Sequence, residues 1–158
     1  QKQLSEISRF IPRKPKILDI GCGVGTTSAM IKMIKPDAEV IGIDIEKRST
    51  WKAYQKQYNV KYFVDDALSL KFKKGEFDVV VSFGVIEHVN DDKKFIDENL
   101  RVLKRGGSAF MLNIPNKYSI NEFFAKRLGQ YHHDKKYNMS EIKSLLTSTG
   151  IKHFMIKI

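Results

Sequence analysis

A glycine-rich stretch near the start of the chain has the composition and spacing of a ligand-binding turn. Three glycines alternate with other residues directly after the apolar run 16–20. Glycine lets the backbone turn sharply, adopt positive φ angles and leave bare peptide open to a ligand. The residues of this stretch, called the glycine turn, are Gly21, Cys22, Gly23, Val24 and Gly25. We expect the glycine turn to join a buried strand to a helix and to hold a nucleotide-like ligand.

The residues around the glycine turn narrow the chemistry of that ligand. Asp19 precedes the first glycine by two positions. A carboxylate there is unfavourable beside an anionic pyrophosphate but suits a ligand with an ammonium or sulfonium charge. The dinucleotide pattern G-x-G-x-x-G is also not met, because the third glycine comes one place early and Thr26 occupies the later position. A nicotinamide-dependent oxidoreductase is therefore disfavoured, although it stays an alternative.

A second carboxylate follows the second predicted strand. Asp44 ends the apolar run 39–44, and open α/β sheets bind ligands at the carboxyl ends of their strands. A carboxylate at this place can accept hydrogen bonds from both hydroxyls of a ribose, and Ile45 is expected to pack on the adenine face. A helix N-cap is the alternative role for Asp44. Dinucleotide enzymes also place an acid here, so this residue alone indicates ribose rather than one particular cofactor.

Two motifs resemble one known family. Residues 17–25 resemble the first motif of class I S-adenosylmethionine-dependent methyltransferases, an acidic residue followed by G-x-G-x-G. Residues 83–89, which contain Glu-His-Val after the fourth predicted strand, resemble the ubiquinone- and menaquinone-type branch, type 11, as does the string 101–107. The resemblance implies S-adenosyl-L-methionine as cofactor and S-adenosyl-L-homocysteine as its product.

The resemblance also implies roles at the ends of the third and fourth strands. Asp66 and Ala67 would reach the adenine edge; Asp65 would do so if the register shifts by one, and a turn cap is the alternative for either acid. Backbone groups of Ser82 and Phe83 would meet the methionine end. The full set of predicted cofactor-binding residues is Asp19, Gly21, Cys22, Gly23, Gly25, Asp44, Ile45, Asp66, Ala67, Ser82 and Phe83.

The elements that must position these residues alternate between strand and helix. Apolar runs predict strands at 16–20, 39–44, 60–64, 77–82, 108–114 and 153–158, and helical spacing predicts helices at 26–35, 47–58, 91–104 and 138–150. We expect an α/β fold, Rossmann-like and doubly wound, with a mostly parallel sheet and helices on both faces. Residues 1–158 are predicted to be a single domain whose sheet lacks the usual seventh strand.

The sequence indicates the residues that would contact the methyl acceptor less specifically than those that would bind the cofactor. His88 is the candidate catalytic residue, since imidazole titrates near neutral pH and can take a proton from an acceptor hydroxyl; a packed histidine at a helix start is the alternative. In the resembling family the segment 115–139 covers the acceptor site, which makes Tyr131, His132 and His133 candidate substrate contacts. A surface loop is the alternative, and because no further ligand stands at metal spacing from these histidines, no metal site is predicted.

Composition limits the partners. The formal net charge is +10, but the basic residues are scattered among acids, so a solvated surface is favoured over a nucleic-acid interface. Because basic residues are in excess within 117–158, an anionic methyl acceptor stays an alternative. A single cysteine excludes an intramolecular disulfide, and with no apolar leader and no apolar run of about 20 residues we expect a cytoplasmic protein without a membrane span. The oligomeric state is not indicated.

Three functions remain. The preferred one is a methyltransferase acting on the oxygen, nitrogen or carbon of a small-molecule acceptor. Methylation of bases through a D-P-P-Y motif is disfavoured because Ser-Phe-Gly-Val follows the fourth strand, although another RNA-directed activity stays open. A cofactor-binding but non-catalytic partner protein is the second function, and the oxidoreductase is the third.

Overall fold

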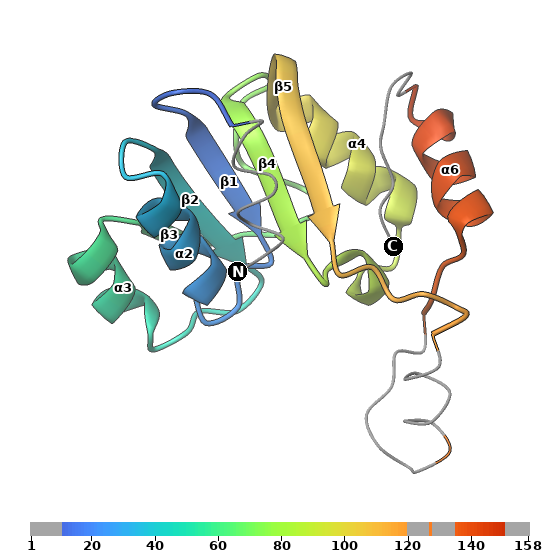
Figure 1. Cartoon of the computed structure of the whole chain (residues 1–158), viewed down its shortest axis with the longest axis horizontal. Coiled ribbons are helices and arrows are strands. Elements are labelled where there is room, and N and C mark those ends of the chain that lie inside the picture. The colour runs from blue at the N-terminus through green and yellow to red at the C-terminus, as the bar shows by residue number, and fades with distance from the viewer. Residues whose placement is uncertain (1–10, 120–126, 128–134, 151–158) are drawn as a thin grey trace.

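The computed structural model describes residues 11–119, 127 and 135–150 of the chain. Five parallel strands form one sheet in the order β3-β2-β1-β4-β5 (Figure 1). The strands are β1 Lys16–Ile20, β2 Glu39–Asp44, β3 Lys61–Val64, β4 Phe77–Phe83 and β5 Leu103–Leu112. Strand order reverses at β1, which has β2 on one side and β4 on the other. The predicted doubly wound α/β fold is confirmed.

Helices cover both faces of this sheet. Helices α2 and α3 lie on one face and α4 and α6 on the other (Figure 1). Their bounds are α2 Thr26–Ile34, α3 Trp51–Tyr58, α4 Asp92–Val102 and α6 Met139–Ser148, and a short 3₁₀ helix, η2, spans Ile86–His88. The start of α6 follows from its sequence, because Asn138 and Glu141 form a capping box in which each side chain accepts from the other residue's backbone N–H.

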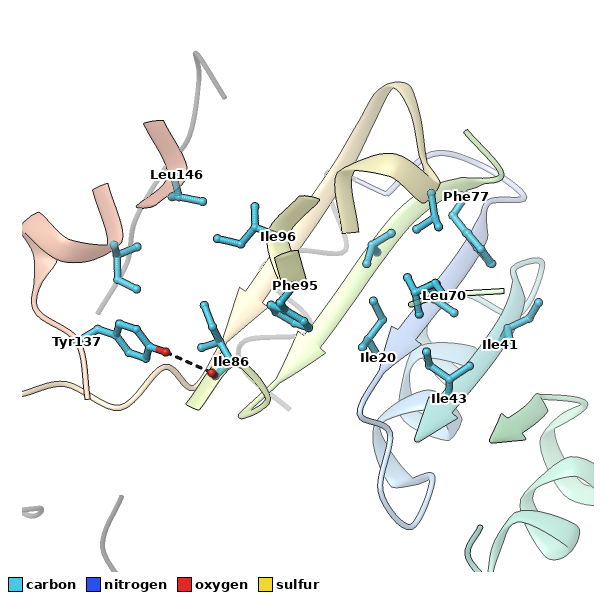
Figure 2. Packing of buried hydrophobic residues seen from close by; sticks show 14 residues of the cluster. Ile20, Ile41, Ile43, Leu70, Phe77, Ile86, Phe95, Ile96, Tyr137 and Leu146 are labelled. Carbon is cyan, nitrogen blue, oxygen red and sulfur yellow. Dashed lines mark hydrogen bonds between the residues drawn. The ribbon is translucent and has the colours of Figure 1, made fainter. Parts of the chain in front are cut away.

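Two apolar clusters, one on each face, hold the layers together. Side chains alternate between the faces of a strand, so Ile17 and Val79 pack toward α2 and α3 while Leu18 and Val80 pack toward α4 and α6. Figure 2 shows the cluster that packs toward α4 and α6, with Phe95 of α4 near its centre. The strands β1 and β4 are buried on both faces, which explains their continuous apolar sequences.

The predicted junction between the helix over 91–104 and the strand over 108–114 is wrong. Helix α4 ends at Val102, and the strand β5 starts at Leu103. Residues 103 and 108 of β5 pair with residues 77 and 79 of β4, so the residues between them form an irregularity in the ladder. Gly106 has a φ of 81°, and a Cβ on Gly107 would lie 2.8 Å from Asp78 O. The two glycines thus serve close strand pairing rather than a helix end.

Some predictions fall where the structure gives no description. The predicted strand 153–158 and the candidate acceptor contacts Tyr131, His132 and His133 lie outside the described residues. Among the helices that are described, none has the length and apolar character needed to cross a membrane.

Candidate functional site

A cleft of about 600 Å³ opens at the carboxyl ends of the strands, where the strand order reverses. Four segments form its wall, one after each of the strands β1, β2, β3 and β4. The lining residues are Ile20, Gly21, Ile43, Asp44, Ile45, Arg48, Asp65, Asp66, Ala67, Leu68, Gly84, Val85, His88, Val89 and Asn90. The cleft therefore collects Gly21, Asp44, Ile45, Asp66, Ala67 and His88 from the predicted site residues.

The glycine turn has the backbone conformation that its composition predicts. Gly21, Gly23 and Gly25 have φ angles of 68°, 53° and 92°, in the left-handed region that glycine adopts without strain. A Cβ on Gly21 would lie 2.5 Å from Cγ2 of Val85. Gly21 is thus required twice, by its backbone angle and by the close approach of the segment after β4 across the cleft.

The amides of the glycine turn are committed to acceptors within the protein. Cys22 N donates to Ile43 O at 2.8 Å, and Gly25 N donates to the carbonyl of Cys22 at 2.9 Å. Gly23 N donates to Oδ2 of Asp44 at 2.8 Å. A phosphate-binding turn instead directs such amides at its anion. With these three amides already paired, and an anionic side chain among their acceptors, the turn is suited to a ligand other than a pyrophosphate.

Asp44 is held in place at the end of β2. Its Oδ2 accepts from Gly23 N, and its Oδ1 accepts from Glu46 N at 3.1 Å. A carboxylate oxygen can accept more than one hydrogen bond. Asp44 can therefore bind hydroxyl groups in the cleft while its orientation is fixed by two backbone amides. The alternative role of Asp44 as a helix N-cap is not seen, because α3 begins only at Trp51.

The two adjacent acids after β3 have different surroundings. Asp65 is buried and accepts from Asp66 N at 3.1 Å and from Lys71 N at 3.0 Å, so both of its oxygens support the turn. Asp66 is exposed and lines the cleft, and its Oδ1 accepts from Leu68 N at 2.8 Å. The preference for Asp66 over Asp65 as the ligand-binding acid thus has a geometric basis, and it stays a prediction.

Side chains of helix α4 hold the segment that follows β3 in place. Arg101 donates to Leu70 O at 2.7 Å and to Phe72 O at 2.8 Å. Glu98 accepts from Leu70 N at 2.8 Å and pairs with Arg101. The side-chain hydrogen bond from Arg101 holds the pKa of Glu98 below its ordinary value, which keeps this carboxylate ionised. The connection between β3 and β4 contains no helix of its own, and these bonds supply its rigidity.

Several predicted contacts do not face the cleft. Asp19 is 1% exposed and accepts a hydrogen bond from Ser28 Oγ at 2.6 Å, behind the glycine turn. Burial raises the pKa of Asp19 from 3.8 to about 7, against the opposing effect of Ser28 and with a smaller contribution from the charge of Asp44. The residues that likewise do not line the cleft are Cys22, Gly23, Gly25, Ser82 and Phe83. Their direct contact with a cofactor stays a prediction.

His88 lies at the cleft wall on a turn that is tied down from both sides. Tyr137 is buried, and its hydroxyl lies 3.2 Å from Ile86 O (Figure 2). The same hydroxyl lies 3.0 Å from Asp92 Oδ2, so that one proton is shared between two acceptors. Lys135 donates to Val89 O at 2.9 Å and also pairs with Asp92. Ile86 and Val89 flank His88 along the chain, so these bonds fix the backbone that carries the imidazole.

The structure adds site residues that the sequence did not suggest. Arg48 and Asn90 line the cleft without belonging to any recognised motif, and Val85, inside the recognised stretch 83–89, lines it without having been given a role. Their only signal in the sequence is position, because each stands within a few residues of a predicted strand end or of His88. Within the described ranges no three His, Cys, Asp or Glu side chains come together in an arrangement that could hold a metal ion.

The sheet order, the glycine turn and the carboxylates at successive strand ends define a class I S-adenosylmethionine-dependent methyltransferase. The family described as "Methyltransferase domain", type 11, matches residues 18–111, and the chain belongs to it. Ubiquinone biosynthesis O-methyltransferase of Pelagibacter ubique is 37% identical over 103 residues, covering 63% of this chain and 42% of that protein. Norajmaline N-methyltransferase of Rauvolfia serpentina is 37% identical over 111 residues, covering 66% of this chain and 38% of that protein.

A solved structure extends the similarity. Phosphoethanolamine N-methyltransferase 2 of Haemonchus contortus, in complex with phosphomonomethylethanolamine and S-adenosylhomocysteine, superposes with a TM-score of 0.73 at 26% sequence identity. The match covers 94% of this chain and 37% of that one. The chain thus spans less than half the length of these three relatives.

Proposed function

We propose that this protein transfers the methyl group of S-adenosyl-L-methionine to an oxygen, nitrogen or carbon atom of a small-molecule acceptor. The observation that carries the proposal is the convergence of Gly21, the first residue of the glycine turn, with Asp44 and Asp66 on one cleft. When bound there, the cofactor supplies an activated methyl group on a sulfonium sulfur. The protein then has mainly to orient the acceptor in line with that methyl group and to exclude water.

The residues of the cleft fit the parts of the cofactor. Asp44 presents acceptor oxygens for ribose hydroxyls from a position fixed by two amides. Asp66 and Ala67 offer an acceptor and a small side chain where an adenine edge can approach, and Ile45, 66% exposed, offers an apolar surface for the ring. Gly21 lines the cleft, so a ligand there can reach the first residue of the glycine turn. Because the amides of the glycine turn already donate to acceptors within the protein, the turn fits this cofactor better than a pyrophosphate.

A small-molecule acceptor agrees with the shape and the relatives. The cleft is concave and of a size found for small-ligand sites. Two relatives are named for O- and N-methylation of small compounds. His88 is positioned to accept a proton from such an acceptor if its nucleophile is a hydroxyl or an ammonium group; an acceptor that carries a free lone pair needs no base. An RNA acceptor and a purely binding role are the competing proposals.

Binding and turnover separate these proposals. Calorimetry should detect binding of S-adenosyl-L-homocysteine and none of NAD; the reverse result would refute the assignment of the cleft. A methyl-donor turnover screen against quinone-precursor phenols, small amines and tRNA then tests the acceptor. Turnover on the phenols or amines supports the proposal, turnover on tRNA alone favours the RNA-directed function, and binding without turnover on any of them favours the non-catalytic partner.

Asp44→Ala tests the site itself. The substitution removes the proposed ribose acceptor and should weaken S-adenosyl-L-homocysteine binding at least tenfold, the effect of one lost charge-assisted hydrogen bond of about 1.5–3 kcal/mol. Asp37→Ala is the matched control, because Asp37 is an exposed acid in the connection between α2 and β2. Equal affinities of the two variants would show that the ribose is bound elsewhere.

A further inference from the structure

Three side chains outside the cleft donate hydrogen bonds to three successive carbonyl oxygens of the glycine turn. The donors belong to the start of α3 and to β3, which lie 26 to 37 residues further along the chain. The pairs are Trp51 Nε1 with Gly23 O at 2.8 Å, Thr50 Oγ1 with Val24 O at 2.6 Å, and Tyr62 OH with Gly25 O at 2.9 Å. None of the three donor residues lines the cleft.

The ring of Tyr62 is fitted into a slot between two glycines. A Cβ on Gly25 would lie 2.9 Å from the hydroxyl of Tyr62, and a Cβ on Gly42 of β2 would lie 2.7 Å from its Cδ1. Trp51 stacks on the other side of the ring, with centroids 5.3 Å apart and an interplanar angle of 15°. Both aromatic residues are buried. Their two donor groups are therefore held against the glycine turn by packing.

The glycine turn is thus paired on both sides before any ligand arrives. Its amides at 22 and 23 donate toward the end of β2, and its carbonyls at 23, 24 and 25 accept from α3 and β3. A glycine-rich segment with three positive φ angles is conformationally free unless such bonds restrict it. A turn that is already ordered loses less entropy when it binds a ligand, and the affinity is higher for that reason.

We propose that Thr50, Trp51 and Tyr62 are positioning residues for cofactor binding, which hold the glycine turn in its binding conformation through its carbonyl oxygens. The inference rests on the proposed role of this turn in holding the cofactor. Burial raises the pKa of Tyr62 well above its ordinary value, so the hydroxyl keeps its proton and remains a donor at physiological pH. The burial of Trp51 and Tyr62 also gives them a role in folding, which the exposed Thr50 does not share.

Thr50 therefore provides the decisive variants. Thr50→Val keeps the shape and removes the donor, whereas Thr50→Ser keeps the donor. We expect Thr50→Val to raise the Kd for S-adenosyl-L-homocysteine about two- to twelvefold, the effect of one net hydrogen bond, with thermal stability close to that of the wild type. Thr50→Ser should bind like the wild type. Equal affinity of Thr50→Val and the wild type, or equal loss in both variants, would overturn the proposal.

Tyr62→Phe gives a second measurement with its own control. Tyr58→Phe removes a hydroxyl from the same helix–strand unit, where Tyr58 contacts Tyr54 rather than the glycine turn. The affinity should fall in Tyr62→Phe and not in Tyr58→Phe; equal affinities would overturn the proposal.

Trp51 supplies a spectroscopic readout, because it is the only tryptophan of the chain. Hydrogen exchange of its indole N–H should accelerate in Thr50→Val and slow when S-adenosyl-L-homocysteine binds. An exchange rate that neither the variant nor the ligand changes would overturn the positioning role. If wild-type protein fails to bind S-adenosyl-L-homocysteine, the assignment of the cleft itself fails; if it binds but Thr50→Val loses nothing, only the positioning role fails.

Discussion

The carboxyl of Asp19 makes folding stability depend on pH in a direction opposite to that of most acids. It is buried behind the glycine turn, where Ser28 donates to it and no cationic side chain is among the groups that shift it. Burial raises its pKa from 3.8 to about 7. Asp19→Asn keeps an oxygen that can accept from Ser28, has nearly the same shape and carries no ionisable group.

The magnitude follows from the difference between the folded and unfolded pKa values. Between pH 3.8 and about pH 7 the unfolded chain has released this proton and the folded protein still binds it. The free energy of unfolding therefore falls as the pH rises, by about 1.4 kcal/mol per pH unit. Above about pH 7 both states are ionised and the contribution becomes constant. The full loss is on the order of 4 kcal/mol.

The stability of Asp19→Asn relative to the wild type should thus rise by about 3 kcal/mol from pH 5 to pH 8, with most of the rise below about pH 7. For a domain of this size the same change corresponds to roughly 6–12 °C in Tm. Denaturant unfolding of both proteins at pH 5, 6, 7 and 8, without ligand, measures the difference directly.

A matched control removes the same charge from the surface. Asp97 lies on α4, its side chain is 45% exposed, and it pairs with Lys93 at 2.6 Å. Asp97→Asn should differ from the wild type by a small amount that stays nearly constant between pH 5 and pH 8, since an exposed pair of this kind contributes about 0.3–0.5 kcal/mol. Parallel pH profiles of Asp19→Asn and the wild type would show that Asp19 is ionised in the folded protein, and the argument from burial would be refuted.

Two further substitutions probe the cleft. Gly21→Ala places a Cβ 2.5 Å from Val85 Cγ2 at a φ of 68°. We expect the free energy of unfolding, measured with denaturant, to fall by about 1–3 kcal/mol, and calorimetry to show weaker binding of S-adenosyl-L-homocysteine. Unchanged values would mean that β1 and the segment after β4 move apart freely. Tyr137→Phe leaves Asp92 and Ile86 O without the shared hydroxyl. It should lower the free energy of unfolding by about 1–3 kcal/mol and accelerate amide exchange at His88, while the affinity for S-adenosyl-L-homocysteine stays within twofold. Slow exchange at His88 would contradict the role of Tyr137 in fixing that turn.

Local sequence was sufficient to place β1, β2, β3 and β4 to within one residue at their ends. The apolar runs that became β1 and β4 are continuous because parallel strands between two helical layers are buried on both faces. Asp44 was predicted from its place after a strand and Asp66 from the resemblance to the methyltransferase family, and the sheet order brings both to one cleft. The glycine turn was identified from its spacing, since few other sequences can adopt three positive φ angles within five residues.

The errors have a common physical origin in contacts between distant parts of the chain. The helix 91–104 was extended too far because Lys104 and Arg105 are good helix formers, whereas pairing of β5 with β4 determines their conformation. A helix over 47–58 was expected, but α3 starts at Trp51, and the preceding Thr50 donates to Val24 O. The burial of Asp19 also depends on such contacts, because the packing of α2 brings Ser28 Oγ to its carboxyl; the assignment of Asp19 to the ligand stays a prediction.

One signal in the sequence pointed to the support of the glycine turn and is understood only with the structure. Gly42 interrupts the apolar run of β2, and a glycine inside a strand often marks the close approach of another group. Here two groups approach, because a Cβ on Gly42 would lie 2.7 Å from Ser28 Oγ and 2.7 Å from Cδ1 of Tyr62. The hydroxyl of the same tyrosine reaches Gly25 O. The glycine of β2 and the last glycine of the turn are thus two sides of one slot. Because a larger residue at either position would displace Tyr62, the composition of β2 is tied to the conformation of the turn that β1 carries.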